Sequence, residues 1–254
     1  MMETAQRVST TLSDNFVFQR SLLAYYEACH HIVPGMVLEI GTGTGYGVDV
    51  IASSCREFIT VDKKEPRQLS SRENVSFRKM TVPPLSFTDS SFDSVVSFQV
   101  IEHIRDDVKM VDEVYRVLRP GGRFVLTTPN ANSSLTRNPW HVREYSAETL
   151  KLLLKSRFDN VSIFGVTGNE KVMAYYEKNR KAVERFRRFD PMDLEHRLPS
   201  WMLRVPYDIM NRINRRRLLQ NNTALTSSIK MSDYRVEEYH EGTLYFDLMA
   251  VAVK

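Results

Sequence analysis

The sequence predicts an α/β protein with a doubly wound, seven-stranded, mostly parallel sheet, an N-terminal helix and a helical insertion before the last strand. Three observations lead to this prediction. Short apolar segments of strand length alternate with segments of helical periodicity over the first two thirds of the chain. A turn with alternating glycines, from Gly41 to Gly45, follows the first apolar segment. After residue 168 the alternation stops, and aromatic and basic residues are intermixed.

The first element is expected to be a helix over residues 16–31, where Phe16, Leu22, Leu23 and Tyr26 recur at helical spacing before Pro34 and Gly35 end it. Further helices are expected over 48–53, 106–118 and 146–155, the last of them capped by Ser146. Strands are expected over 36–40, 57–61, 75–79, 92–98, 123–128, 161–166 and 243–253.

Residues 169–242 are expected to form the helical insertion, a lid and substrate-specificity element over the sheet edge, and 1–168 with 243–254 the main, ligand-binding domain. Pro191, Pro199 and Pro206 are expected to divide the insertion into short helices. Between residues 171 and 217 the chain has 13 Lys and Arg against 6 Asp and Glu, a surplus of 7, whereas the whole chain has a net charge of +4. These cations either form solvated helix faces or contact nucleic acid or anionic lipid.

Composition excludes several classes of protein. No apolar run approaches the roughly 18 residues of a membrane span, and the N-terminal segment carries Glu3 and Asp14 without the apolar stretch of a signal peptide. We therefore expect a cytoplasmic protein. Cys29 and Cys55 are the two cysteines, and their spacing fits neither a disulfide framework nor a zinc knuckle.

The turn after the first predicted strand has the features of a ligand-binding turn. Glycines at 41, 43 and 45 permit positive φ and close approach of a ligand to the backbone. The dinucleotide pattern G-x-G-x-x-G, counted from Gly41, requires glycine at position 46, where Tyr46 stands. Glu39, two residues before the first glycine, suits a cationic amino group and would repel a pyrophosphate. A domain that binds another nucleotide is the alternative.

A second carboxylate, Asp62, ends the next predicted strand about twenty residues later. A carboxylate at this position can accept hydrogen bonds from both hydroxyls of a ribose. Together, Glu39 and Asp62 favour a ligand that joins an adenosine to a cationic tail.

In this order and spacing, segments 37–47, 58–63, 87–104 and 116–130 resemble the motifs of class I S-adenosylmethionine-dependent methyltransferases, whose fold is Rossmann-like. The resemblance spans roughly residues 16–166 and implies S-adenosyl-L-methionine as the cofactor. It places the adenine beside Thr81 and Val82, although the family commonly has an acidic residue where Thr81 stands. The cofactor-binding residues that the resemblance implies are Arg20, Glu39, Gly41, Thr42, Gly43, Gly45, Asp62, Lys63, Thr81, Val82, Gln99 and Val100.

Methyl transfer from a sulfonium is an in-line displacement, so the protein's main tasks are alignment and exclusion of water. A hydroxyl acceptor also benefits from a base, and His103 and His141, which follow the fourth and fifth strands, are the predicted catalytic residues. Together with Gln99 and Glu102 they resemble the metal-binding set of small-RNA 3′-terminal 2′-O-methyltransferases, which have glutamate where Gln99 stands. One carboxylate of that set is therefore missing. Two imidazoles and one carboxylate can still hold a divalent ion, but a Glu-His pair after this strand occurs widely in methyltransferases that use no metal, and no metal is expected.

Trp140, Arg143 and Tyr145 are the predicted acceptor-binding residues. Their segment, 138–145, is similar to one that follows the fifth strand in many bacterial methyltransferases of unassigned or glycan-related substrate. The two rings would stack on an acceptor, and the guanidinium would bind a carboxylate or phosphate. The alternative is a packed loop held by a salt bridge.

The resemblance therefore predicts an enzyme, an O-methyltransferase that acts on a small-molecule, lipid-linked or glycan-linked acceptor. Two alternatives stay open. One is an RNA methyltransferase of the 2′-O type that uses the basic insertion, and the other is a non-catalytic module that binds S-adenosylmethionine.

Overall fold

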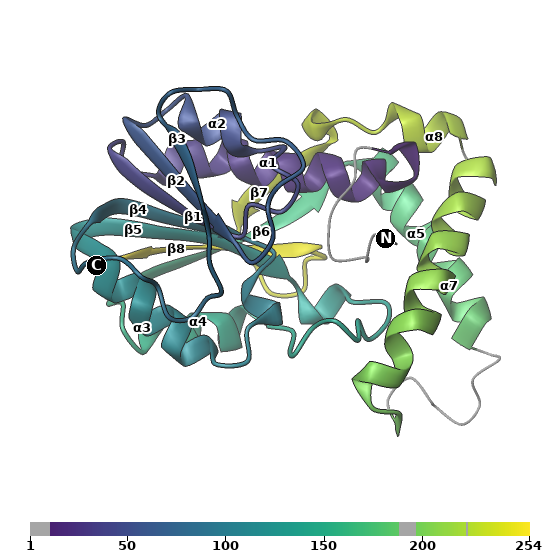
Figure 1. The fold of residues 1–254 in the computed structure, drawn as a ribbon. Coiled ribbons are helices and arrows are strands. Elements are labelled where there is room, and N and C mark those ends of the chain that lie inside the picture. The colour runs from purple at the N-terminus through teal and green to yellow at the C-terminus, as the bar shows by residue number, and fades with distance from the viewer. Residues whose placement is uncertain (1–10, 188–196, 222) are drawn as a thin grey trace.

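The computed structural model describes residues 11–187, 197–221 and 223–254, which form one mixed sheet of eight strands with helices on both faces (Figure 1). The strand order is β3-β2-β1-β4-β5-β8-β6-β7. Neighbours from β3 to β5 are parallel, whereas β8 runs antiparallel to β5 and β6, and β7 runs antiparallel to β6. The strands are β1 (Met36–Ile40), β2 (Glu57–Asp62), β3 (Val75–Lys79), β4 (Phe92–Phe98), β5 (Leu118–Pro129), β6 (Asn160–Gly168), β7 (Tyr234–Glu238) and β8 (Asp247–Val253).

The predicted count of seven strands is wrong by one, because β7 lies within the segment assigned to the helical insertion. Tyr234 and Val236 alternate along β7 with charged residues, and its edge position leaves Glu238 exposed. Charged side chains are typical of edge strands and conceal the apolar alternation that identifies a strand. The part of the predicted insertion at 188–196, with Pro191, lies outside the described residues.

The helices form two layers over the sheet and a separate group at one end. α1 and α2 cover one face and α3 and α4 the other, as Figure 1 shows. Ser146 caps α4 through a reciprocal bond with Thr149, which confirms the predicted helix start. The helices are α1 (Asn15–His31), α2 (Val48–Ala52), α3 (Asp107–Val117), α4 (Ala147–Lys155), α5 (Glu170–Arg187), α7 (Ser200–Asn221) and α8 (Thr223–Ser228).

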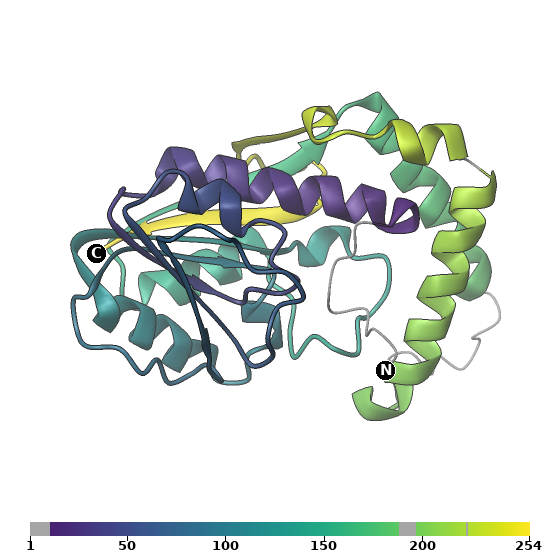
Figure 2. The same cartoon turned by 45° about the horizontal axis from the view of Figure 1, so that its top comes forward.

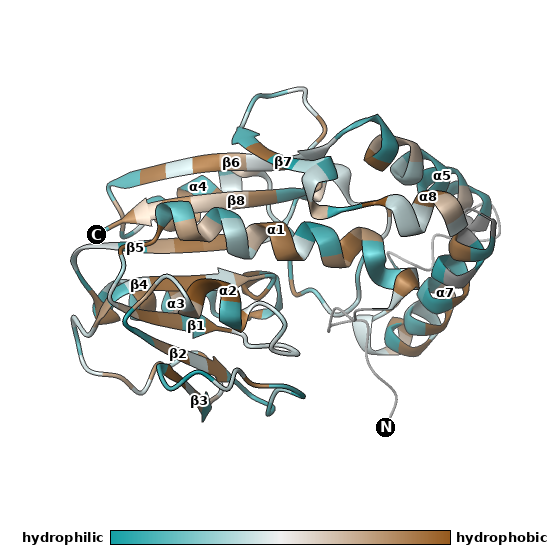
Figure 3. Ribbon diagram, turned by 90° about the horizontal axis from the view of Figure 1, so that it is seen from above, coloured by the Kyte–Doolittle hydropathy of each residue, from teal (hydrophilic) through white to brown (hydrophobic). Residues whose placement is uncertain are grey.

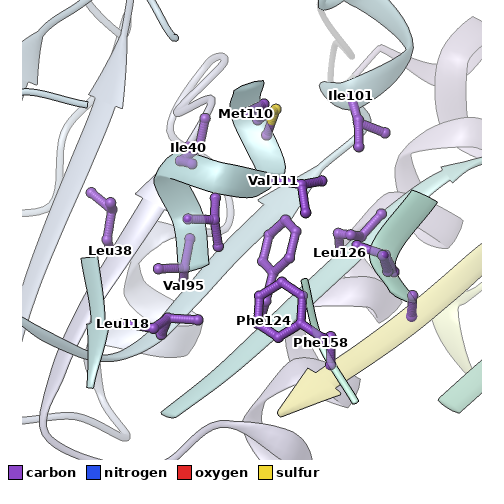
Figure 4. Packing of buried hydrophobic residues seen from close by; sticks show 14 of the residues in the cluster. Leu38, Ile40, Val95, Ile101, Met110, Val111, Leu118, Phe124, Leu126 and Phe158 are labelled. Carbon is purple, nitrogen blue, oxygen red and sulfur yellow. The ribbon is translucent and has the colours of Figure 1, made fainter. Parts of the chain in front are cut away.

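The core consists of two apolar layers, one on each face of the sheet, because alternate strand residues point to opposite faces. Val37 on β1 packs toward α1 and α2, whereas Leu38 and Ile40 pack toward α3 and α4. The layer under α3 and α4 includes Phe124, which belongs to β5, and Phe158 (Figure 4). β1 is largely apolar along its length, and β5 is apolar over residues 124–126 (Figure 3).

The helices α5, α7 and α8 lie beyond the end of the sheet at which the parallel strands finish (Figures 1 and 2). α7 is continuous through Pro206, so the prediction that this proline divides two helices is wrong. Pro206 is exposed, so water can hydrogen-bond the carbonyl that loses its helical partner. Within the described part of the chain, every helix is too short or too polar to cross a membrane.

Candidate functional site

The glycine turn after β1 adopts the backbone conformation that its sequence predicts. Gly41, Gly43 and Gly45 have φ of +96°, +60° and +89°. The Gly41 amide donates to the carbonyl of Val61 at 2.8 Å, so the turn crosses the end of β2. A Cβ at Gly41 would lie 2.4 Å from the Val100 side chain, whereas a Cβ at Gly43 would meet nothing within 4 Å. The turn is therefore packed at its base and open at Gly43.

Asp62 is bonded directly to this turn. Its Oδ2 accepts the Gly43 amide at 3.0 Å, and its Oδ1 accepts the Lys64 amide at 2.9 Å. The Met80 amide donates to the Asp62 carbonyl at 2.9 Å, which brings Thr81 beside the end of β2. The predicted methionine, ribose and adenine segments thus lie at one edge of the sheet, as parallel strands require of ligand sites.

Glu39 is fully buried beneath the turn. Its carboxylate accepts hydrogen bonds from the Tyr25 hydroxyl at 2.7 Å and from the Thr60 hydroxyl. Burial raises the pKa of Glu39 to about 7, against the opposing effect of these two donors. Sequence reasoning missed both donors. Thr60 could have been predicted from the sequence, because it stands two residues before Asp62 in the same strand and therefore points to the same face as Asp62.

Arg20 lies in a buried ion pair that sequence reasoning did not foresee. Its Nε is 2.7 Å from Oδ2 of Asp247, and the two side chains are 16% and 5% exposed. Burial raises the pKa of Asp247, whereas Arg20 and Gln99 lower it. Gln99 itself has φ of +56°, and its backbone N–H donates to the Thr127 carbonyl at 2.9 Å. Arg20 and Gln99 therefore both act on Asp247, which pairs with the end of β5 at Pro129, and their predicted contact with the cofactor stays a prediction.

The two predicted catalytic histidines are brought together. The His103 and His141 ring centroids are 4.9 Å apart, and one ligand atom each of Glu102, His103 and His141 lies within 4.8 Å of the others. His103 Nδ1 is 3.0 Å from the Trp140 carbonyl oxygen, and His141 Nδ1 is 3.0 Å from Glu144 Oε1.

Burial governs the ionisation of this cluster. It lowers the pKa of His103 to about 4 and raises the pKa of Glu102 to about 8. His103 is therefore a neutral imidazole near pH 7. A neutral imidazole can accept a proton or bind a cation, and it does neither once protonated.

The predicted acceptor-binding residues are packed against other protein groups. Tyr145 is 3% exposed, and its hydroxyl donates to Asp107 at 2.7 Å; Arg143 pairs with the same carboxylate. Trp140 Nε1 donates to Asp208 on α7 at 3.0 Å, and Arg204 lies over its ring. This arrangement is the packed loop of the alternative interpretation. Stacking on an acceptor stays a prediction, and it has no support from these contacts.

Comparison with known proteins is consistent with this geometry. A family profile described as a methyltransferase domain matches residues 38–126, from the middle of β1 into β5. The chain is 38% identical over 162 residues to a probable S-adenosylmethionine-dependent methyltransferase of Mycolicibacterium smegmatis, with 60% of this chain and 63% of that protein covered. A probable S-adenosylmethionine-dependent methyltransferase of Mycobacterium tuberculosis is 35% identical over the same length, with 60% and 59% covered.

Solved structures share the fold. A SAM-dependent methyltransferase of Thermotoga maritima superposes with a TM-score of 0.57 at 16% identity, over 94% of this chain and 92% of that one. Residues 38–126 of this chain thus form a methyltransferase domain of the class I S-adenosylmethionine-dependent type. A Haemonchus contortus phosphoethanolamine methyltransferase in complex with S-adenosyl-L-methionine has the same methyltransferase fold, with a TM-score of 0.55 at 18% identity over 92% and 52% of the two chains.

The chain spans about 60% of the length of the two mycobacterial methyltransferases. The matched methyltransferase profile includes the glycine turn, Asp62 and the Glu102-His103 pair. It ends before His141 and before α5, α7 and α8. The loop that carries His141 and the helices α5, α7 and α8 are therefore outside the matched region.

Proposed function

We propose that the protein transfers a methyl group from S-adenosyl-L-methionine to a hydroxyl oxygen of a small-molecule, lipid-linked or glycan-linked acceptor. The hydrogen bond from the Gly43 amide to Asp62 supports this proposal most directly. It holds a carboxylate beside the one glycine of the turn at which an added Cβ would meet no other atom within 4 Å. An adenosine cofactor with a cationic tail needs such an open backbone surface beside a carboxylate.

The residues present fit this cofactor. Asp62 would hold the ribose, and Gly41 and Gly43 would hold the methionine part, above the buried Glu39 carboxylate. Beside this edge, the buried Oδ1 of Asp247 has no hydrogen-bond partner among the described residues, whereas its Oδ2 pairs with Arg20. The cofactor supplies a methyl group on sulfonium sulfur, and the C–S electron pair stays on sulfur when an acceptor oxygen takes the methyl carbon.

The protein's own contribution is alignment and proton transfer. His103 donates from Nδ1 to the Trp140 carbonyl, which leaves Nε2 free of a proton and able to accept one from the acceptor hydroxyl. The loop containing His141 is held to the same point because the Val142 amide donates to the Glu102 carbonyl at 2.8 Å. A base fixed by these bonds needs no rearrangement before it acts.

The outward face of α7 favours a lipid-linked acceptor. Trp201, Val205, Ile209 and Ile213 recur every four residues and are 70%, 67%, 52% and 42% exposed. A surface helix normally turns its apolar stripe toward the core. α7 does the reverse, and so its apolar stripe is available to a partner.

The less exposed side of α7, which also includes Leu203 and Tyr207, makes several polar contacts. Asp208 accepts from Trp140, Asn214 donates to Asn179, and Arg215 pairs with Asp14. The exposed side also carries Arg212 and Arg217 within the basic stretch of the insertion. An apolar stripe flanked by arginines suits an anionic membrane surface, on which the helix would lie without crossing it.

The two alternatives keep less support. The exposed apolar stripe of α7 does not suit RNA, which is bound through cationic and stacking contacts. The intact glycine turn and the paired histidines suit an active enzyme better than a non-catalytic module.

Calorimetric titration with S-adenosyl-L-methionine and S-adenosylhomocysteine tests the reaction. We expect both to bind within the range of about 1 μM to 1 mM that is usual for enzyme ligands. Labelled S-adenosylmethionine should then transfer its methyl group to an organic-solvent extract of lipids and glycolipids, and not to oligonucleotides. Lack of binding at about 1 mM would overturn the proposal.

A further inference from the structure

We propose that Glu102, His103 and His141 form a binding site for a divalent first-row transition-metal cation. One ligand atom from each residue lies within 4.8 Å of the other two. Glu102 and His103 belong to the 3₁₀ turn Ile101–His103 after β4, and His141 to the loop after β5. The inference deepens the proposed function. Cation binding itself does not depend on that function, whereas the use of the cation in catalysis does.

Each imidazole has, at Nδ1, a hydrogen-bond partner of the kind that metal-bound histidines usually have. A carbonyl oxygen can only accept, so His103 Nδ1, 3.0 Å from the Trp140 oxygen, carries the proton and Nε2 keeps its lone pair. The same argument applies to His141, whose Nδ1 lies 3.0 Å from a Glu144 carboxylate oxygen. A carbonyl or carboxylate on the second ring nitrogen is the common outer shell of metal-bound histidine.

The third ligand is held just as firmly. Glu102 is 1% exposed, and its Oε2 accepts the Thr128 hydroxyl at 3.1 Å.

The side-chain amide of Asn138 lies 2.8 Å from Nε2 of His141 and donates to its lone pair. A cation would take over this lone pair, and so the Asn138 amide would have to move aside.

The donor set and its surroundings select the class of cation. Two imidazole nitrogens and one carboxylate oxygen suit zinc, cobalt, manganese or iron better than magnesium or calcium, which prefer oxygen alone. The acidic groups Asp247 and Glu144 act electrostatically on Glu102 and favour a cation, whereas Lys63 acts on His103 and opposes it.

A cation bound here would act as a Lewis acid toward an acceptor hydroxyl at the sheet edge. The Nε2 atoms of His103 and His141 would then be ligands, and neither would serve as the general base. With a cation bound, this assignment replaces the proton-accepting role that the sequence predicts for the two residues, a role that His103 keeps in the metal-free protein.

Cobalt binding without cofactor tests the site. Chelator-treated full-length protein is titrated with Co²⁺, and its visible absorption bands are followed. We expect one Co²⁺ per chain, with affinity reduced at least about 100-fold in Glu102→Gln and in His141→Asn, and about 10- to 100-fold in Glu144→Gln, which removes an outer-shell charge. His30→Asn is the control. The His30 side chain is 73% exposed in the last turn of α1, outside the cluster, and this variant should bind Co²⁺ as the parent does.

Two measurements on the same samples keep the outcomes separate. Thermal unfolding without metal shows whether each variant is folded. If Glu102→Gln, at a buried position, does not fold, His141→Asn, at a position in a loop, still tests the site. Equal Co²⁺ affinity in the parent and in a folded ligand variant would overturn the cation site. Calorimetry with S-adenosylmethionine tests the proposed function independently, because a loss of cofactor binding leaves Co²⁺ binding intact.

Discussion

The Tyr25 hydroxyl donates a 2.7 Å hydrogen bond to the Glu39 carboxylate and so connects α1 to the end of β1. The Tyr25 ring also lies against the backbone of Gly47, where a Cβ would come within 2.3 Å of it. Its centroid is 4.4 Å from that of Phe98 on β4. The N-terminal helix is therefore a structural part of the glycine turn, although it lies outside the residues that match the family profile.

Removing this hydroxyl should destabilise the fold without disturbing its packing. Tyr25→Phe leaves a buried carboxylate oxygen without one of its donors, which we expect to lower the free energy of unfolding by about 1–3 kcal/mol. Urea denaturation measures the change. Tyr26→Phe, at a ring that is 46% exposed, is the matched control and should stay within about 0.5 kcal/mol of the parent. Equal effects of the two substitutions would contradict the assignment.

The buried Glu39 carboxyl should make stability depend on pH. Its pKa is about 7 in the folded chain against an ordinary value of 4.5, so the folded state holds a proton that the unfolded state releases between these values. Stability is thus undiminished below pH 4.5 and falls by about 1.4 kcal/mol per pH unit as pH rises toward 7. Glu39→Gln lacks this titration. The stability of the variant relative to the parent should rise through that window, and a pH-independent difference would refute the argument.

The open position at Gly43 predicts a loss of cofactor binding that is not a loss of folding. Gly43 and Gly121 have similar positive φ, +60° and +77°, and neither would place a Cβ within 4 Å of another atom. Gly43→Ala and Gly121→Ala should therefore each cost about 1–2 kcal/mol of stability. Only Gly43→Ala adds a methyl group beside the proposed cofactor, so calorimetry should show weaker binding of S-adenosylmethionine for that variant alone. Equal affinities would place the cofactor elsewhere.

The Arg20–Asp247 pair separates a structural from a cofactor-binding role. Arg20→Met leaves the nearly buried Asp247 charge without its partner, and we expect a loss of about 3–5 kcal/mol by chemical denaturation. Adding Asp247→Asn removes that charge and should restore most of the stability. If Arg20 also contacts the cofactor carboxylate, the double variant should still bind S-adenosylmethionine at least about tenfold more weakly. A double variant as unstable as the single one would contradict the pairing.

Local sequence signals predicted the positions of Glu39, Asp62 and the glycine turn at the strand ends, whereas their contact with a cofactor stays a prediction. Glu39 and Asp62 were recognised because each stands at the end of a buried apolar strand, where the chain must turn and parallel strands finish together. The positive φ at Gly41 and Gly43 followed from residue type alone.

Contacts between residues far apart in the chain could not be predicted from the sequence. Nothing near Arg20 indicates that its partner is Asp247, more than two hundred residues away on the last strand. Tyr145 was assigned to the acceptor because segment 138–145 resembles one in other methyltransferases and its ring could stack on an acceptor. A local pattern cannot tell whether a ring faces a ligand or the core, and this ring packs in the core. β7 was missed because its edge position places charged residues within a short strand.

The apolar stripe of α7 should bind anionic membranes. Val205 and Ile209 are 67% and 52% exposed on its outward face, and burying such side chains contributes about 1.5–3 kcal/mol each. The parent protein should sediment with vesicles containing phosphatidylglycerol, less so at high salt, and the double variant Val205→Glu/Ile209→Glu should bind at least tenfold more weakly. Leu152→Glu, at a residue 73% exposed on α4, supplies a matched charge away from the stripe and should leave binding unchanged. If analytical ultracentrifugation instead shows a dimer that the double variant abolishes, and vesicles do not bind the parent, the stripe joins two copies of the chain and the lipid assignment is wrong.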